Sequence, residues 1–115
     1  MSNEVRELVL RTRSADAAVV LSAVGEVDMV SAPKLSSAVA EALGTGAPVL
    51  VIDLSEVGFF GSAGLSVLVE ALEASAGRKL RVVATAPVRR PVELTGLDEL
   101  LDIYGTLEEA LAGSE

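Results

Sequence analysis

The chain has 115 residues and carries nine basic and 17 acidic side chains, which give a formal net charge of −8. This balance argues against nucleic-acid binding, because no cationic surface could release counterions from a phosphate backbone. With no cysteine and no histidine, the chain lacks disulfides, thiolate chemistry and the usual general base near neutral pH. No apolar run approaches the roughly 20 residues of a membrane span. We therefore expect one soluble, cytoplasmic domain over residues 1–115, with no catalytic residue, no metal site and no cofactor.

The first elements predicted along the chain form a β-hairpin followed by a helix. Residues 5–13 alternate imperfectly between apolar and charged side chains, which suits an edge strand, and residues 17–24 are rich in β-branched and small apolar side chains. Residues 25–28 are then expected to leave the sheet. Because Ser31 is followed closely by proline, we expect it to be the N-cap of a helix that runs to Leu43.

The rest of the chain alternates strands with helices. Residues 49–54 form a continuous apolar run, which suits a central strand covered on both faces. A turn of small residues follows, and a helix then opens on Ser62. Further along we expect a strand at 80–84, a short helix from Pro91, a strand at 103–104, and a helix entered from Thr106 with Glu109 in the capping-box position.

The predicted order of elements is β-β-α-β-α-β-α-β-α. Strands joined through helices are expected to be parallel with right-handed crossovers, and neighbouring strands then place these helices on one face. We therefore predict a single α/β domain with a mixed sheet of four or five strands and helices mainly on one face. The expected core includes Val51, Ile52, Leu65, Leu68, Val69, Leu72, Val82 and Val83, and Leu100 is expected to point inward with Val92 and Leu97.

The turn before the second helix carries the most informative group. Ser62 stands at the positive end of that helix, where free backbone N–H groups and the helix dipole would stabilise a phosphate. Because the chain offers it no imidazole base, this serine is better placed to receive chemistry from another protein than to act as a nucleophile. The same hydroxyl could instead cap an orphan N–H, and the two roles are compatible.

Asp28 is the second candidate for a functional position. It follows a strand end and precedes a helix, and ligands collect where parallel strands end, so we expect it beside Ser62. The alternative is an exposed loop carboxylate or a local Asx-type hydrogen bond. We interpret Asp53 as a structural carboxylate. Of Phe59 and Phe60, we expect one in the core and one exposed.

Three motifs, together with the order of elements, resemble the STAS domain family over nearly the whole chain. They are Gly25-Glu26-Val27-Asp28, Asp53-Leu54-Ser55 and Gly61-Ser62-Ala63-Gly64-Leu65. The chain looks most like the stand-alone bacterial anti-sigma factor antagonists. The resemblance implies that an anti-sigma factor with serine kinase activity phosphorylates Ser62, that the unphosphorylated antagonist binds this kinase and frees a sigma factor, and that a serine phosphatase resets the cycle.

The resemblance also implies a partner-binding surface made of Asp28, Ser31, Gly61, Ser62, Ala63 and Gly64. One position departs from the family pattern, because Gly61 stands where an aspartate usually precedes the serine. Two other classes of function remain open at this point. One is an accessory subunit of an ABC-type lipid transport complex, and the other is a carboxylate-based enzyme. A pull-down would distinguish a histidine-kinase-like ATPase and a sigma factor from a transporter ATPase.

Overall fold

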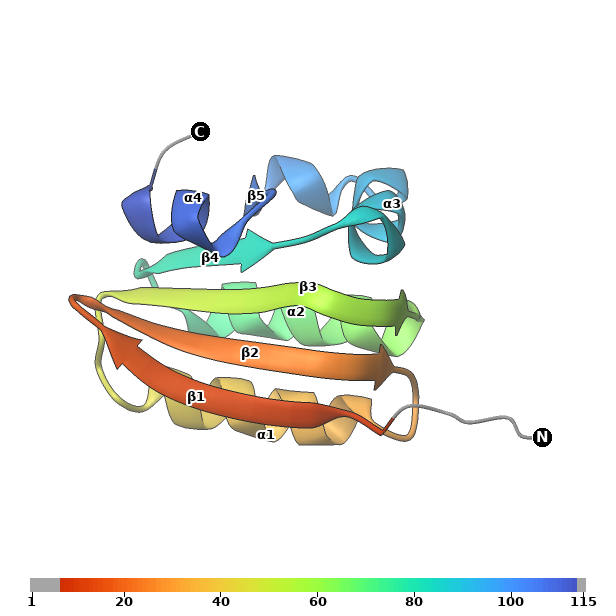
Figure 1. Cartoon of the computed structure of the whole chain (residues 1–115), viewed down its shortest axis with the longest axis horizontal. Coiled ribbons are helices and arrows are strands. Elements are labelled where there is room, and N and C mark those ends of the chain that lie inside the picture. Colours follow the sequence, from red (N-terminus) through yellow and green to blue (C-terminus); the bar gives the residue numbers. More distant parts are fainter. Residues whose placement is uncertain (1–6, 114–115) are drawn as a thin grey trace.

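The computed structural model describes residues 7–113, which form a five-stranded sheet with four α-helices and one 3-10 turn (Figure 1). The elements are β1 (Val9–Ala15), β2 (Ala18–Val27), α1 (Ala32–Leu43), β3 (Val49–Phe60), α2 (Ser62–Ala74), β4 (Lys79–Val83), α3 (Ala86–Leu94), η1 (Leu97–Glu99), β5 (Asp102–Tyr104) and α4 (Leu107–Ala112). The strands lie in sequence order. β1 pairs antiparallel with β2, and every other pair is parallel. The predicted fold class is confirmed.

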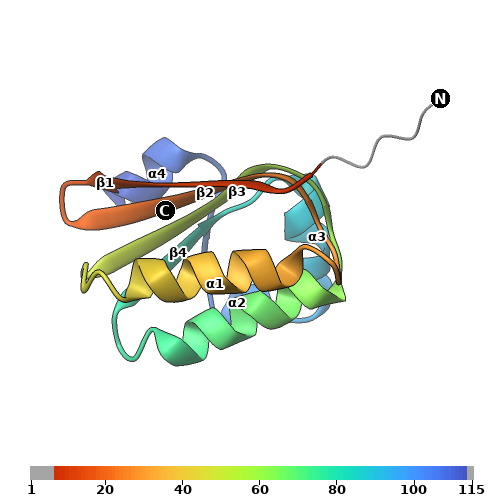
Figure 2. The same cartoon turned by 90° about the horizontal axis from the view of Figure 1, so that it is seen from below.

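Helices α1, α2 and α3 cover one face of the sheet, and α4 covers part of the other (Figure 2). Each parallel connection moves one strand further in the same direction. Right-handed crossovers therefore place all three connecting helices on the same side. α4 follows the last strand and makes no crossover, so it is free to pack on the opposite face. The prediction of helices mainly on one face is confirmed.

Two apolar cores result, one on each face of the sheet. The larger core lies under α1–α3, and the smaller core lies under α4. Consecutive residues of β3 serve both, because Val51 and Ile52 point to opposite faces and each is fully buried. The Arg81 guanidinium donates to the Ala110 carbonyl at 2.9 Å and fastens α4 to β4. The Thr106 hydroxyl accepts the Glu109 N–H at 3.2 Å, as the predicted cap requires.

β2 and β3 are both longer than the sequence indicated. β2 continues to Val27 instead of ending before residue 25, and β3 continues to Phe60 instead of ending at Leu54. The two extensions pair with each other, with Val27 opposite Phe60. Irregularities in the ladder at 22–24 and 25–26 absorb the glycine and polar residues that had indicated a strand end. Pairing between the strands thus outweighs the local signals.

The buried face of α2 is rotated from the predicted one. Its buried residues are Gly64, Val67, Leu68 and Ala71, whereas Leu65 and Leu72 are half-buried and Val69 is 38% exposed. The expectation that Val69 lies in the core was therefore wrong. Leu65 and Leu72 still pack against the larger core, and the face nearest the sheet is the one with Gly64, which sets the distance between α2 and the Phe60 ring. Each Cβ adds to that distance, and Gly64 has none.

The segment after β4 also differs from expectation. α3 begins at Ala86 and not at Pro91, which lies inside the helix. Because Pro91 has no N–H, α3 lacks only the backbone hydrogen bond to the carbonyl of residue 87, and the helix continues through this position. Leu97 is buried as expected, but Leu100 is 64% exposed, so its inward placement was wrong. At the other end, the hairpin is confirmed. β1 starts at Val9, and residues 5 and 6 of the expected strand lie outside the described residues.

Gly25 is the position where a side chain is least tolerable. Its φ is +127°, and an added Cβ would lie 2.6 Å from the Glu7 carbonyl oxygen. We expect Gly25→Ala to lower the free energy of unfolding by about 2 kcal/mol or more, measured by urea denaturation. Gly46→Ala is the matched control, because Gly46 has φ +78° but no atom near an added Cβ. Its expected loss is about 1 kcal/mol, and equal losses would contradict the close-approach explanation.

Candidate functional site

The ends of β2 and β3 bring the predicted site residues together. The Gly61 N–H donates to the Val27 carbonyl at 3.0 Å, so the last residue of β2 is joined to the first residue after β3. Asp28 and Ser62 consequently lie on one edge of the sheet, as expected. Both line an open pocket of about 350 Å³, called here the rim pocket, whose lining residues are Asp28, Met29, Phe59, Gly61, Ser62, Ala63 and Ser66.

Ser62 is the first residue of α2, and Gly61 occupies the N-cap position. Ser62 is exposed, and its hydroxyl makes no hydrogen bond to any other described residue. The N–H groups of Ser62 and Ala63 likewise find no acceptor among residues 7–113, and the first turn of α2 contains no acidic side chain. The hydroxyl therefore does not cap the helix. It stands free at an uncompensated positive helix end.

Gly61 is not demanded by the backbone. Its φ of −88° and ψ of −172° are extended values that any residue adopts. An added Cβ would lie 3.2 Å from Cε2 of Phe59, whose ring is 52% exposed and therefore has room to shift. The aspartate usual in the family would fit here.

Gly64 has a different place from its neighbours in the motif. It is buried against the Phe60 ring, where an added Cβ would lie 2.8 Å from ring carbons. Phe60 is 4% exposed and Phe59 is 52% exposed, so the expected division of this aromatic pair is confirmed. Gly64 thus shapes the turn from within, while Ser62 and half-buried Ala63 face the rim pocket.

Asp28 and Ser31 fix the loop between β2 and α1. The Asp28 carboxylate accepts the N–H groups of Val30 and Ser31 at 3.0 Å each. The Ser31 hydroxyl donates its single proton to the Glu26 carbonyl at 2.9 Å and accepts the Asp28 N–H at 3.0 Å. The hydrogen bonds that the Asp28 carboxylate accepts, above all the one from the Ser31 N–H, lower the pKa of Asp28 below its ordinary value of 3.8. The structure therefore contains the Asx-type bond that was the alternative interpretation of Asp28.

Ser31 differs from its predicted role. It holds the N-cap position of α1, but its hydroxyl caps no helical N–H. Its backbone is already helical, with φ −90° and ψ −19°, and the hydroxyl turns back to Glu26 instead. Ser31 does not line the rim pocket. It supports Asp28, which does.

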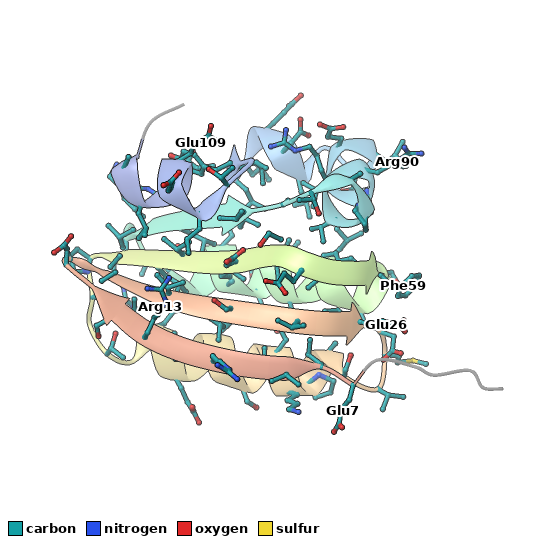
Figure 3. The ribbon with its side chains drawn as sticks, in the orientation of Figure 1. Glu7, Arg13, Glu26, Phe59, Arg90 and Glu109 are labelled. Atoms are coloured by element: carbon teal, nitrogen blue, oxygen red, sulfur yellow. The ribbon has the colours of Figure 1, made fainter. Side chains whose placement is uncertain are left out.

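The sequence interpretation missed the exposed apolar side chains of Met29 and Val30 beside the rim pocket. Met29 is 80% exposed, Val30 is 87% exposed, and Phe59 projects from the end of β3 near Glu26 (Figure 3). Because the loop backbone is bonded to Asp28 and Ser31, the two side chains between them point to solvent. The sequence signal for these exposed side chains is the pair Met29 and Val30, which lies in a loop between the hydrogen-bonding residues Asp28 and Ser31. Adjacent exposed apolar side chains mark contact surfaces.

Among the described residues, the other carboxylates either have a structural role or do not cluster. The Asp53 carboxylate accepts the Ser55 N–H at 3.0 Å and the Ser55 hydroxyl at 2.7 Å, which confirms its structural interpretation. Within residues 7–113, no three acidic side chains gather closely enough to hold a metal ion. The same part of the chain contains no helix that is both long and apolar enough to cross a membrane.

Comparison with known proteins assigns the fold and the motifs to one family. The model of the STAS domain matches residues 9–110. The chain therefore belongs to the STAS domain family, in agreement with the resemblance of its three motifs.

Individual relatives are regulatory proteins of this family. The anti-sigma-F factor antagonist RsfB of Mycobacterium tuberculosis is 43% identical over 96 residues, which cover 82% of this chain and 79% of RsfB. The crystal structure of an anti-sigma factor antagonist from Mycobacterium paratuberculosis aligns with a TM-score of 0.89 and 39% identity over 93% of each chain. The Bacillus cell fate determinant SpoIIAA in its phosphorylated form shares the fold, with a TM-score of 0.69 and 17% identity over 91% of this chain and 98% of its own.

Gly61→Asp tests the departure from the family pattern. A carboxylate at this N-cap can accept the unbonded Ala63 N–H, and glycine cannot. We expect the free energy of unfolding to rise by a few tenths to about 1 kcal/mol, measured by urea denaturation. Gly61→Ala is the control, because it adds the same Cβ beside Phe59 without an acceptor. If the aspartate and alanine variants have the same stability, the capping argument is wrong.

Asp28→Asn tests the lowered pKa. A carboxyl whose pKa is lowered by folding adds stability above its unfolded pKa, and this contribution is lost as the pH falls through the folded pKa. We expect wild type to have a higher melting temperature than Asp28→Asn near neutral pH. This difference in melting temperature should disappear as the pH falls below 3.8. Thermal melts down to about pH 2.5 measure it. Glu73→Gln is the control, because it alters an exposed carboxylate that makes no hydrogen bond to described residues.

Proposed function

We propose that this protein is an anti-sigma factor antagonist. It binds an anti-sigma factor that has serine kinase activity, and this binding frees a sigma factor in the cytoplasm. The names of the mycobacterial relatives support the proposal, since the chain is 43% identical to one over most of its length and superposes on another with a TM-score of 0.89. The rim pocket is the surface offered to the partner.

The composition of the rim pocket suits a protein partner. Exposed Met29 and Phe59 supply its apolar side chains, exposed Val30 lies next to Met29 in the chain, and Asp28 and Ser62 supply polar groups. Stable interfaces combine such a desolvated apolar centre with a polar surround. The hydrogen bonds of Asp28 and Ser31 hold the loop in place before the partner arrives, which reduces the entropy lost on binding.

The observation that carries the proposed switch is the free Ser62 hydroxyl at the uncompensated start of α2. A phosphate there adds about −1.5 to −2 charges and can accept the unbonded N–H groups of Ser62 and Ala63. The folded domain therefore tolerates the modification. A partner surface closing over the rim pocket does not, because it would enclose a dianion.

The chemistry of the switch comes from other proteins. The chain contains no histidine and no cysteine, and no base contacts the Ser62 hydroxyl in the described structure. The anti-sigma factor supplies the phosphoryl group, and a serine phosphatase removes it. In this proposal the protein itself is a binding module and not an enzyme.

Phosphosite mapping after incubation with the cognate kinase and ATP tests the switch directly. We expect modification of Ser62 and none in Ser62→Ala. Ser66 provides the matched control, because it is exposed, lies one turn further along α2 and lines the same pocket. Ser66→Ala should be phosphorylated like wild type. Phosphate on another residue of wild type would reject Ser62.

Affinity measurements test the consequence for binding. Ser62→Ala should bind the anti-sigma factor whether or not kinase activity is present. Ser62→Glu should lose about 30- to 150-fold in affinity, roughly 2–3 kcal/mol, while melting near the wild-type temperature. Equal affinities of these two variants, or recovery of a transporter ATPase in place of an anti-sigma factor in a pull-down, would contradict the proposal.

A further inference from the structure

Met29 places a sulfur atom in the rim pocket. The residue is 80% exposed and lines the pocket. The chain contains no cysteine and no tryptophan, and its only other methionine is Met1. Peroxides convert accessible thioethers to sulfoxides. Within residues 7–113, the most readily oxidised side chain therefore lies on the surface proposed to bind the partner.

The loop around Met29 keeps its side chain at the surface. The Asp28 carboxylate accepts the Val30 N–H at 3.0 Å, and the Asp28 carbonyl accepts the Ala32 N–H at 2.8 Å. The Ser31 hydroxyl accepts the Asp28 N–H at 3.0 Å. These bonds join the residues on the two sides of Met29. A rearrangement that buried Met29 would have to break them, so the thioether stays accessible in the folded protein.

Oxidation of Met29 changes the character of the rim pocket. Met29 and Phe59 are the two large apolar side chains among its lining residues, which include no lysine or arginine. A sulfoxide keeps the length of the side chain but adds a strongly polar oxygen to it. A partner that closes over the pocket would have to bury this oxygen. A polar group that is buried without a hydrogen bond lowers affinity.

We propose that Met29 is a site of reversible oxidation by peroxide and that its sulfoxide weakens binding of the anti-sigma factor. This inference rests on the proposed function and adds a redox control of the rim pocket to the phosphorylation of Ser62. Because Met29 is exposed, the folded domain tolerates the sulfoxide, and only the contact with the partner is affected.

The chemical step is a transfer of one oxygen atom. A sulfur lone pair of Met29 attacks one oxygen of hydrogen peroxide, and the O–O bond breaks. The other oxygen leaves as water with both protons, so that sulfur loses the two electrons that the peroxide gains. Methionine sulfoxide reductases reverse the oxidation. Two thiols supply the electrons for this reversal, and they form a disulfide while the oxygen leaves as water.

The rate of oxidation tests the accessibility of Met29 independently of any partner. Peptide mass spectrometry after treatment with hydrogen peroxide measures the fraction of Met29 that has gained one oxygen. We expect the rates in the folded protein and in the urea-unfolded chain to agree within about twofold, because the folded residue is 80% exposed. A rate about tenfold slower in the folded protein would overturn the inference.

Calorimetry tests the effect on binding. Wild type is treated with hydrogen peroxide, separated from it, and titrated with untreated, unphosphorylated anti-sigma factor. We expect the affinity to fall about tenfold or more, while the melting temperature stays near that of untreated wild type. Incubation with methionine sulfoxide reductases and a dithiol should restore the affinity. An unchanged affinity after complete oxidation of Met29 would overturn the inference.

Two variants assign the effect to Met29. Met29→Leu keeps an apolar side chain of similar size and keeps Met1, but position 29 is no longer oxidised. Whatever the starting affinity of this variant, peroxide treatment should leave it unchanged. Adding Leu111→Met places an exposed thioether on α4, which packs on the sheet face opposite α1–α3. Its oxidation should not alter affinity either. A loss of affinity in either variant after peroxide treatment would overturn the assignment to Met29.

The outcomes separate this inference from the proposed function. If untreated wild type binds the anti-sigma factor and Ser62→Glu binds poorly, but oxidised wild type binds like untreated wild type, the redox inference fails alone. If untreated wild type does not bind the anti-sigma factor, both proposals fail.

Discussion

The arrangement of this protein depends on the parallel pairing of β2 and β3 to their very ends. Val27 lies opposite Phe60, and the Gly61 N–H closes the pairing on the Val27 carbonyl. This bond holds two loops, which are far apart in the chain, at one edge of the sheet. If either strand ended where its local sequence suggests, Asp28 and Ser62 would belong to separate flexible connections. Strand pairing therefore creates the site.

Hydrogen bonding divides the polar residues of this edge into two groups. Asp28, Ser31 and Asp53 bond to nearby backbone and fix the loops. Ser62 makes no such bond within the described structure and stands at a helix end with free N–H groups. A residue that already satisfies local donors cannot change state without loosening its loop. Ser62 can accept a phosphate without that consequence, which makes it the suitable position for a switch.

Helix α2 links the folding core to the rim pocket. Its buried residues face the sheet, where Gly64 admits the Phe60 ring, and Ser62, Ala63 and Ser66 line the rim pocket. The same helix begins at Ser62. A partner that closes over the rim pocket would meet any charge placed at the helix start. One helix thus contributes to the core, to the rim pocket and to the proposed phosphorylation site.

The sequence by itself determined the α/β class, the order of elements, the hairpin, the central apolar strand and the candidate Ser62, because these follow from periodicity, turn residues and motifs that are local. Its family resemblance also indicated the kind of partner. Only the tertiary structure decided that β2 and β3 extend to residues 27 and 60, that Val69 faces outward, and that Met29 is exposed beside the pocket. Those features depend on pairing between distant strands and on how closely a helix approaches the sheet. Helical spacing groups Val69 with Leu65 and Leu72, but the side of α2 that lies closest to the sheet is the one where Gly64 meets the Phe60 ring, and this leaves Val69 exposed.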